Sequence, residues 1–172
     1  MDKYGNTAVM LAASRGHIEV VRALLAAPGI DINQSQENMG WTAVMLASIN
    51  GHAEVLRVLF AKWASVNEYS RERWTAVMYA AAYGHTEVVR ALLAAPGIDV
   101  NKAAWYGETA VFVAAKNGHT EVVRALVAAP GIDVNGRVTH GDYKGMTALG
   151  MAIGLKMKPA IAALLRAAGA EE

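Results

Sequence analysis

The sequence contains no cysteine among its 172 residues. Disulfide bonds, thiolate metal sites and cysteine nucleophiles are therefore excluded. An excess of one charge sign is also lacking, because 16 Lys and Arg and 15 Asp and Glu leave a formal net charge of +1. We therefore expect no nucleic-acid partner and no anionic membrane partner, since both depend on bulk positive charge.

Long uncharged segments are missing too. The longest stretch without Asp, Glu, Lys or Arg covers residues 38–53, which is shorter than the roughly 18 residues of a membrane-spanning helix. The first residues, Met1-Asp2-Lys3-Tyr4, lack the apolar segment of a secretion signal. We therefore expect a cytoplasmic protein. Its 54% apolar content is enough for a sizeable core in about one domain.

The sequence repeats itself five times. Thr-Ala-Val-Met, or a close variant, begins at Thr7, Thr42, Thr75, Thr109 and Thr147, so the spacings are 35, 33, 34 and 38 residues. A Gly-His pair follows nine residues after each of the first four threonines. A period of this length predicts stacked structural units that share one elongated core.

The third copy shows what one unit contains. Thr75 is placed to cap a short helix with a face of small residues, and Gly84 to stop it in the left-handed conformation. A second helix over Thr86–Ala95 carries an apolar stripe, and Pro96 and Gly97 end it. A short extended segment and a turn then lead to the next threonine, forming what we call a finger.

These motifs resemble the ankyrin repeat family. The family pattern of Thr-Pro-Leu-His, two alanines, Gly-His, a Val-Val helix and Asp-Val-Asn is matched along essentially the whole chain. The resemblance implies an all-α fold, a solenoid of five stacked helix-turn-helix units with β-hairpin-like fingers. It implies a single domain over residues 1–172, with repeats at about 2–34, 35–67, 68–101, 102–135 and 136–172. The family histidine is replaced by Met10, Met45, Met78, Phe112 and Gly150, and we expect the first four of these in the core.

Motifs for catalysis are not found. The sequence has no phosphate-binding loop, nucleophile elbow or HExxH zinc motif. His-x-Glu occurs at His17, His52, His85 and His119, but the cysteines of the zinc deaminase signature are absent. One histidine per repeat would be spaced too widely to share a metal, so we interpret these histidines as polar caps between the two helices of a unit. We expect no enzyme activity, cofactor or metal.

Variation is concentrated in the fingers. Residues 84–101 and 118–135 differ only at Leu93 and Val127, whereas the finger tips share almost nothing. In ankyrin proteins the tips and the exposed side of the first helices usually contact a protein partner. The candidate contact residues are Tyr4, Met39, Trp41, Ile49, Arg71, Arg73, Trp74, Tyr83, Trp105, Tyr106, Lys116, Asn117, His140, Tyr143 and Lys144.

Four aromatic residues stand out as anchors. Trp41, Trp74, Trp105 and Tyr106 are expected to provide most of the affinity, because exposed aromatic residues bury large areas on binding. Packing of Trp41 and Trp74 against neighbouring fingers remains an alternative.

The expected function is binding of another folded protein through the concave face, without catalysis. The near-identical frame with variable tips suggests an engineered or designed binder, and a fragment of a longer natural array is an alternative. Self-association as a repeat scaffold is a third possibility, because the first unit lacks a polar capping helix and residues 159–170 carry a single charge.

Two local features depart from the repeat pattern. The segment from Asn135 to Thr147 is four residues longer than its counterpart from Asn101 to Thr109, so we expect it to project and to contact the partner. Shortening it should barely change the thermal midpoint. Trp63 occupies the place where the family usually has a left-handed glycine, and we favour a role as a buried wedge over a role as a contact.

Overall fold

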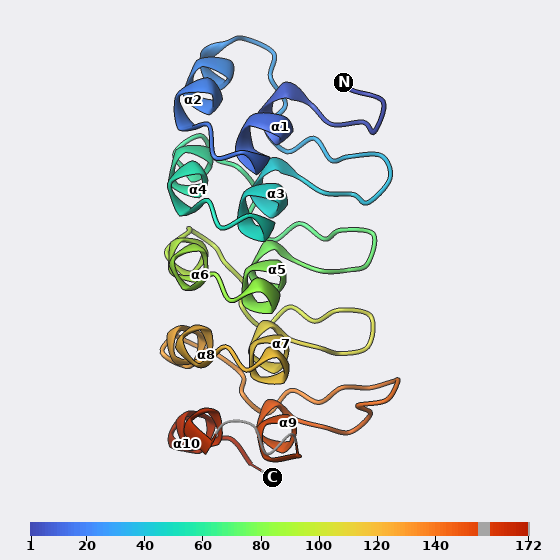
Figure 1. Ribbon diagram of the computed structural model, residues 1–172, viewed down its shortest axis with the longest axis vertical. Coiled ribbons are helices and arrows are strands. Elements are labelled where there is room, and N and C mark those ends of the chain that lie inside the picture. Colours follow the sequence, from blue (N-terminus) through green and yellow to red (C-terminus); the bar gives the residue numbers. More distant parts are fainter. Residues whose placement is uncertain (155–158, 172) are drawn as a thin grey trace.

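The computed structural model describes residues 1–154 and 159–171, which fold into two rows of short helices (Figure 1). The helices are α1 (Ala8–Ser14), α2 (Ile18–Ala26), α3 (Ala43–Ile49), α4 (Ala53–Phe60), α5 (Ala76–Tyr83), α6 (Thr86–Leu93), α7 (Ala110–Asn117), α8 (Thr120–Val127), α9 (Ala148–Gly154) and α10 (Pro159–Ala167). Odd-numbered helices form the inner row beside the fingers, and even-numbered helices form the outer row. The predicted all-α solenoid of five stacked units is confirmed.

The inner helices begin at the repeated threonines. The hydroxyl groups of Thr7, Thr42 and Thr109 each accept a hydrogen bond from the backbone N–H three residues later, at 3.2 to 3.4 Å. This is the N-cap interaction that the sequence predicted. Thr75 has the same extended backbone conformation, but there the N–H of Met78 donates to the Thr75 carbonyl.

The core runs without interruption through all five repeats. Met10, Met45, Met78 and Phe112 are completely enclosed, as predicted. Apolar residues of the outer helices, such as Val88 and its counterparts in α4 and α8, belong to the same buried cluster. Because no single repeat covers its own apolar face, the stack folds through contacts between neighbouring repeats.

The repeated histidines join neighbouring repeats. Nε2 of His52, His85 and His119 lies 2.9 to 3.1 Å from a backbone oxygen near the end of the preceding inner helix, and the ring makes no capping bond within its own repeat. The interpretation as caps between the two helices of one unit is therefore corrected, because the acceptor belongs to the repeat before. The ring also lies beside the left-handed glycine of that repeat.

Asparagines form a second link between repeats. Oδ1 of Asn67 accepts from the N–H of Asp99 at 2.9 Å, and its Nδ2 donates to the oxygen of Gly97 at 2.7 Å. Asn101 and Asn135 make the same two bonds to the following repeat. These residues, which are nearly identical from repeat to repeat, thus hold adjacent repeats in register.

The fingers are hairpin turns that project to one side of the stack (Figure 1). We number them by repeat as residues 1–6, 34–41, 67–74, 101–108 and 136–146. A backbone hydrogen bond closes each base, for example from the N–H of Ser70 to the oxygen of Trp74 at 2.9 Å. No strand occurs in residues 1–154 and 159–171, so the fingers are hairpin-like turns without a ladder.

Trp63 adopts, with φ 63°, the left-handed conformation that the family glycine usually has at this place in the repeat. The N–H of Trp63 donates a hydrogen bond to the carbonyl oxygen of Phe60, and the N–H of Ala64 donates one to that of Leu59. This is the usual hydrogen-bond pattern where a helix ends in a left-handed residue. The indole is 84% exposed. The preference for a buried wedge is therefore wrong, because the left-handed backbone directs the side chain into solvent.

The fifth finger reaches further out than its neighbour between α6 and α7, as predicted (Figure 1). It is also anchored more firmly than a simple projecting loop. Val138 is buried, and the ring of Tyr143 lies 6.1 Å from that of Phe112 in the core. A backbone bond from Thr139 N–H to the oxygen of Tyr106 ties this finger to the fourth one.

Candidate functional site

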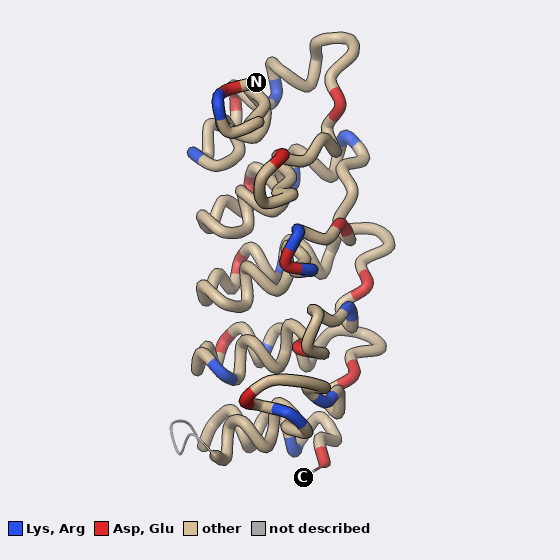
Figure 2. The backbone as a smooth tube through the Cα atoms, turned by 90° about the vertical axis from the view of Figure 1, so that its right-hand side faces the viewer, with Lys and Arg blue, Asp and Glu red and all other residues tan. Residues whose placement is uncertain are grey.

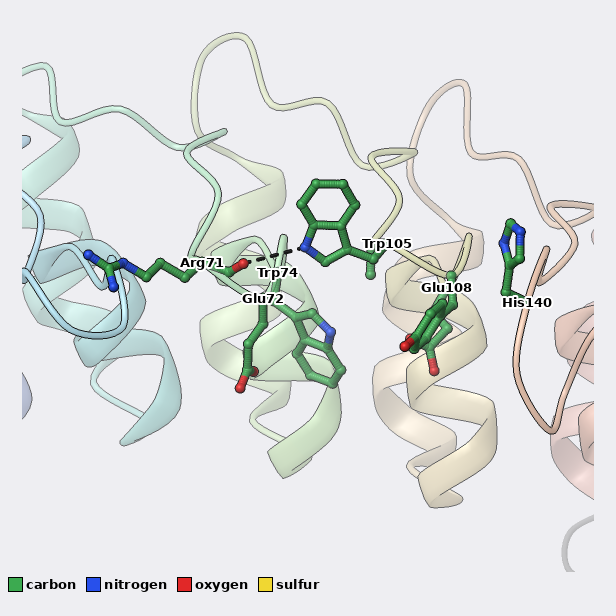
Figure 3. A pocket seen from close by; sticks show the side chains of 8 residues that line it. Arg71, Glu72, Trp74, Trp105, Glu108 and His140 are labelled. Atoms are coloured by element: carbon green, nitrogen blue, oxygen red, sulfur yellow. Dashed lines mark hydrogen bonds between the residues drawn. The ribbon is translucent and has the colours of Figure 1, made fainter.

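A hollow on the finger side lies between the third and fourth fingers (Figure 3). We call it the finger groove, and its volume is about 740 Å³. Its lining residues are Arg71, Glu72, Trp74, Ala104, Trp105, Tyr106, Glu108 and His140. Five of these were predicted as contact residues, so the fold brings together a third of the candidates in one place.

Trp105 forms an aromatic wall of the finger groove. Its indole N–H donates to the backbone oxygen of Arg71 at 3.4 Å, drawn as a dashed line in Figure 3. The guanidinium of Arg73 lies 5.2 Å from the ring centre, and Arg73 is not among the lining residues. The ring is still 64% exposed, and neighbouring Tyr106 is 56% exposed. These contacts fix the indole while leaving much of it open to a ligand.

The finger groove is open because Arg73 takes a position that other fingers give to glycine. A Cβ at Gly40 would lie 3.1 Å from the N of Arg71, and one at Gly107 would lie 2.8 Å from the oxygen of Arg137. Those glycines let the next finger approach closely. Arg73 has φ 59° and a real Cβ, so the fourth finger cannot come as near to the third.

The backbone hydrogen bonds between neighbouring fingers differ along the stack. The second and third fingers are joined by the bond from Arg71 N–H to the oxygen of Met39, and the fourth and fifth by that from Thr139 N–H to Tyr106. Among the described residues, no backbone bond joins the third finger to the fourth, and none joins the first finger to the second. The indole N–H of Trp105 crosses the gap between the third and fourth fingers to the oxygen of Arg71, and Nζ of Lys102 in the fourth finger lies 4.5 Å from the ring centre of Tyr69 in the third.

Below the finger groove, two tryptophans pack around a buried tyrosine of α5. The indole N–H of Trp41 donates to the hydroxyl of Tyr79 at 3.0 Å, and the ring of Trp74 lies 5.3 Å from that of Tyr79. The Tyr79 hydroxyl in turn donates to Ser70 at 3.1 Å. Trp41 and Trp74 are therefore half-buried structural residues, with part of Trp74 left to line the groove.

A second hollow of about 400 Å³ continues the finger groove down to the inner helices α5 and α7. Glu72, Trp74 and Glu108 line both. Tyr83, which is 58% exposed, and Lys116 also line this second hollow. The two hollows together make one concave surface over the third and fourth repeats, which we call the concave site.

Charges around the concave site are mixed, and most of the basic ones are already engaged. Lys116 pairs with Glu108 at 3.8 Å and lies 4.3 Å from the ring centre of Tyr143. Lys102 and Arg73 both lie over the ring of Tyr69. Figure 2, which faces the fingers, shows acidic and basic residues alternating along the stack.

Comparison with known proteins agrees with this architecture. A model described as ankyrin repeats (3 copies) matches residues 29–104 and 101–171, and one described as ankyrin repeats (many copies) matches residues 2–47. The chain belongs to the ankyrin repeat family. Ankyrin repeats are generally protein–protein interaction modules without catalytic activity. No curated protein matches the chain.

The remaining predicted contacts of this ankyrin repeat chain lie outside the finger groove. Asn117 lines the lower hollow, while its amide nitrogen donates to the oxygen of Val113 in its own helix. Tyr143 is half-buried between Phe112 and Lys116. Met39, Ile49 and Lys144 line neither hollow, although none of them is fully buried.

Tyr4 lies at the far N-terminal end, away from the concave site. Its ring is 5.0 Å from Nζ of Lys3. The finger that carries it is held by Asp2, whose carboxylate accepts hydrogen bonds from the side chain and the backbone of Asn6. These bonds, the side-chain bond first, lower the pKa of Asp2 below its ordinary value.

The candidate list missed three residues that shape the concave site. Glu72 and Glu108 lie in the finger tips, where the aromatic and basic residues gave the stronger signal of a protein contact. Tyr79 was missed because it lies within a helix whose equivalent positions hold Leu11, Leu46 and Val113. A tyrosine at a position that is otherwise aliphatic was the available signal, since a buried hydroxyl requires a partner.

Within the part of the ankyrin repeat chain that the structure describes, no three His, Asp or Glu residues gather into a group that could hold a metal ion. In the same residues, no helix has the length and apolar character needed to cross a membrane.

Proposed function

We propose that this ankyrin repeat chain binds a folded protein partner through the concave site, without catalysis. The observation that carries the proposal is the set of large aromatic residues left exposed there. Trp105, Tyr106 and Tyr83 are each more than half exposed, and exposed aromatic residues of this kind are enriched among binding hot spots.

The surrounding structure supports a preorganised site. Trp105 is held by Arg71 and Arg73, and Trp74 is held by Tyr79. Rigid aromatic residues lose little conformational freedom on binding, which favours affinity. The near-identical frame with variable fingers supports an engineered or designed binder, since a constant scaffold would then present chosen contacts.

Affinity capture with matched variants tests the proposal. The immobilised chain is compared with Trp105→Ala and Tyr106→Ala, and the control is Trp63→Ala, which removes an even more exposed indole outside the concave site. We expect a protein that is retained by the wild type and by the control but lost with the two groove variants. The affected contacts should cost about 2 kcal/mol or more in affinity. Equal retention by all variants would reject the concave site.

The second candidate function is head-to-tail self-association, which one observation favours. Val20 in α2 is 48% exposed, whereas the equivalent Val55, Val88 and Val122 are each 1% exposed. At the other end, Ile153 is 40% exposed where the equivalent Ala115 is 3% exposed. Each end of the stack therefore presents the kind of surface that internal repeats bury against a neighbour, and a second copy would cover both.

Light scattering across a range of concentrations tests self-association. We expect the mass to rise with concentration for the wild type and to remain that of a monomer for Val20→Glu. Arg22→Glu, on the same helix and paired with Glu19 at its exposed outer surface, serves as the control for added negative charge and should still associate. A wild-type monomer at every concentration would eliminate this candidate.

A further inference from the structure

We propose that the finger groove receives a basic side chain of the protein partner. The aromatic walls formed by Trp74, Trp105 and Tyr106 and the carboxylate of Glu72 would hold it. This inference rests on the proposed function, because it specifies the chemistry of the partner at the same site.

The first argument is that aromatic rings on this side of the molecule already bind cations. Arg73 lies 4.8 Å from the ring centre of Tyr69 and 5.2 Å from that of Trp105. Lys102 lies 4.5 Å from the ring centre of Tyr69. The electron-rich face of a tryptophan or tyrosine attracts a cation within about 6 Å. The finger groove presents two further rings, Trp74 and Tyr106, together with the exposed part of Trp105.

The second argument concerns charge. Two carboxylates line the finger groove, and that of Glu108 is paired with Lys116 at 3.8 Å. Among the ion pairs of the described residues, none includes Glu72. Glu72 is therefore the carboxylate that remains to pair with a charge brought by the partner.

The basic groups near the finger groove do not oppose this assignment. Figure 3 shows the guanidinium of Arg71 extending away from the groove toward the second repeat. The guanidinium of Arg73 lies over the ring of Trp105, and Lys116 pairs with Glu108. His140, at the far end, is 2.9 Å from the hydroxyl of Thr139. What remains in the hollow is its aromatic lining and the carboxylate of Glu72, a combination that suits an arginine or lysine side chain.

A pair of short peptides provides the direct test. Acetyl-Gly-Arg-Gly-amide is titrated into the full chain, and acetyl-Gly-citrulline-Gly-amide serves as the neutral isostere. Two-dimensional NMR follows the indole N–H signals of Trp74, Trp105 and Trp63. We expect the arginine peptide to shift the signals of Trp74 and Trp105 in a saturable manner while that of Trp63 stays fixed. The citrulline peptide should bind about three- to tenfold more weakly.

Variants then identify the groups responsible. Glu72→Gln keeps the shape of the side chain and should weaken the arginine peptide about two- to fivefold, and Trp105→Leu should weaken it by a similar factor. Glu68→Gln, an exposed carboxylate of the same finger that does not line the groove, should leave binding unchanged. Equal binding of the two peptides, or no effect of Glu72→Gln, would overturn the inference. A captured protein that still required Trp105 would then leave the proposed function standing.

Discussion

The indole N–H of Trp41 donates a hydrogen bond of 3.0 Å to the hydroxyl of Tyr79, 38 residues further along the chain. The same hydroxyl donates to Ser70, so one buried oxygen joins the second finger, the third finger and α5. The ring of Trp74 packs against the ring of Tyr79, with the ring centres 5.3 Å apart. The floor of the concave site is therefore built on Tyr79.

Removing the Tyr79 hydroxyl should weaken this arrangement without leaving a cavity. We expect Tyr79→Phe to lower the free energy of unfolding by about 1 to 2 kcal/mol, because the indole N–H of Trp41 loses its acceptor in a partly buried place. Tyr83→Phe is the matched control, since that tyrosine lies exposed at the end of the same helix, and it should change stability little. Urea unfolding of the two variants measures the difference, and equal midpoints would show that the hydroxyl is dispensable.

The close approach of Gly84 to the ring of His119 predicts a loss of stability when Gly84 is replaced by alanine. Gly84 and Gly97 have nearly the same backbone conformation, with φ +75° and +74°, but a Cβ at Gly84 would lie 2.7 Å from Nδ1 of His119, whereas one at Gly97 meets nothing within 4 Å. Gly97→Ala should cost about 1 to 2 kcal/mol from backbone strain alone. Gly84→Ala should cost clearly more, because the histidine that links the repeats is displaced. Thermal unfolding compares them, and equal losses would contradict the contact.

Trp63 offers a stabilising substitution. Its indole is exposed and its backbone is left-handed, so Trp63→Gly should raise the free energy of unfolding by about 1 kcal/mol. Trp63→Ala keeps the backbone strain and should give no such gain. Chemical denaturation of both variants is the measurement. A loss of stability in the glycine variant would mean that the indole packs in solution.

Replacing Arg73 with glycine should also raise the free energy of unfolding, and it should change the spacing of two fingers as well. We expect Arg73→Gly to relieve strain of about 1 kcal/mol and to let the fourth finger approach the third, as at Gly40 and Gly107. The backbone N–H of Trp105 should then exchange with solvent more slowly. Hydrogen exchange followed by NMR tests this, and an unchanged rate would show that another feature holds the finger groove open.

The fifth finger is expected to stabilise the protein as well as project from it. Tyr143 packs against Phe112 and Lys116, so Tyr143→Ala should lower the free energy of unfolding by about 1 to 3 kcal/mol. Tyr106→Ala, at an exposed tip, should cost less than about 0.5 kcal/mol. Differential scanning calorimetry compares them. Shortening the finger should accordingly lower the thermal midpoint, in contrast to what loop length alone predicts.

Much of the fold was readable from the sequence because the signals repeat. The capping threonines, the left-handed glycines and the apolar stripes occur at equivalent places in successive copies, and each acts through contacts within a few residues. The methionines that replace the family histidine were correctly expected in the core for the same reason. The place of Trp63 matches that of a left-handed glycine in the family, but neither its backbone conformation nor the exposure of its side chain followed from the sequence.

The sequence by itself determined the repeat, its helices and which residues vary, since these follow from local propensity and spacing. Only the tertiary structure decided what lies across repeat boundaries. It placed the rings of His52, His85 and His119 against the preceding repeat and gathered Trp41 and Trp74 around Tyr79. It also opened the finger groove beside Arg73. Apart from that between Trp74 and Tyr79, these contacts join residues 30 or more positions apart, so their distances are fixed by how the repeats stack.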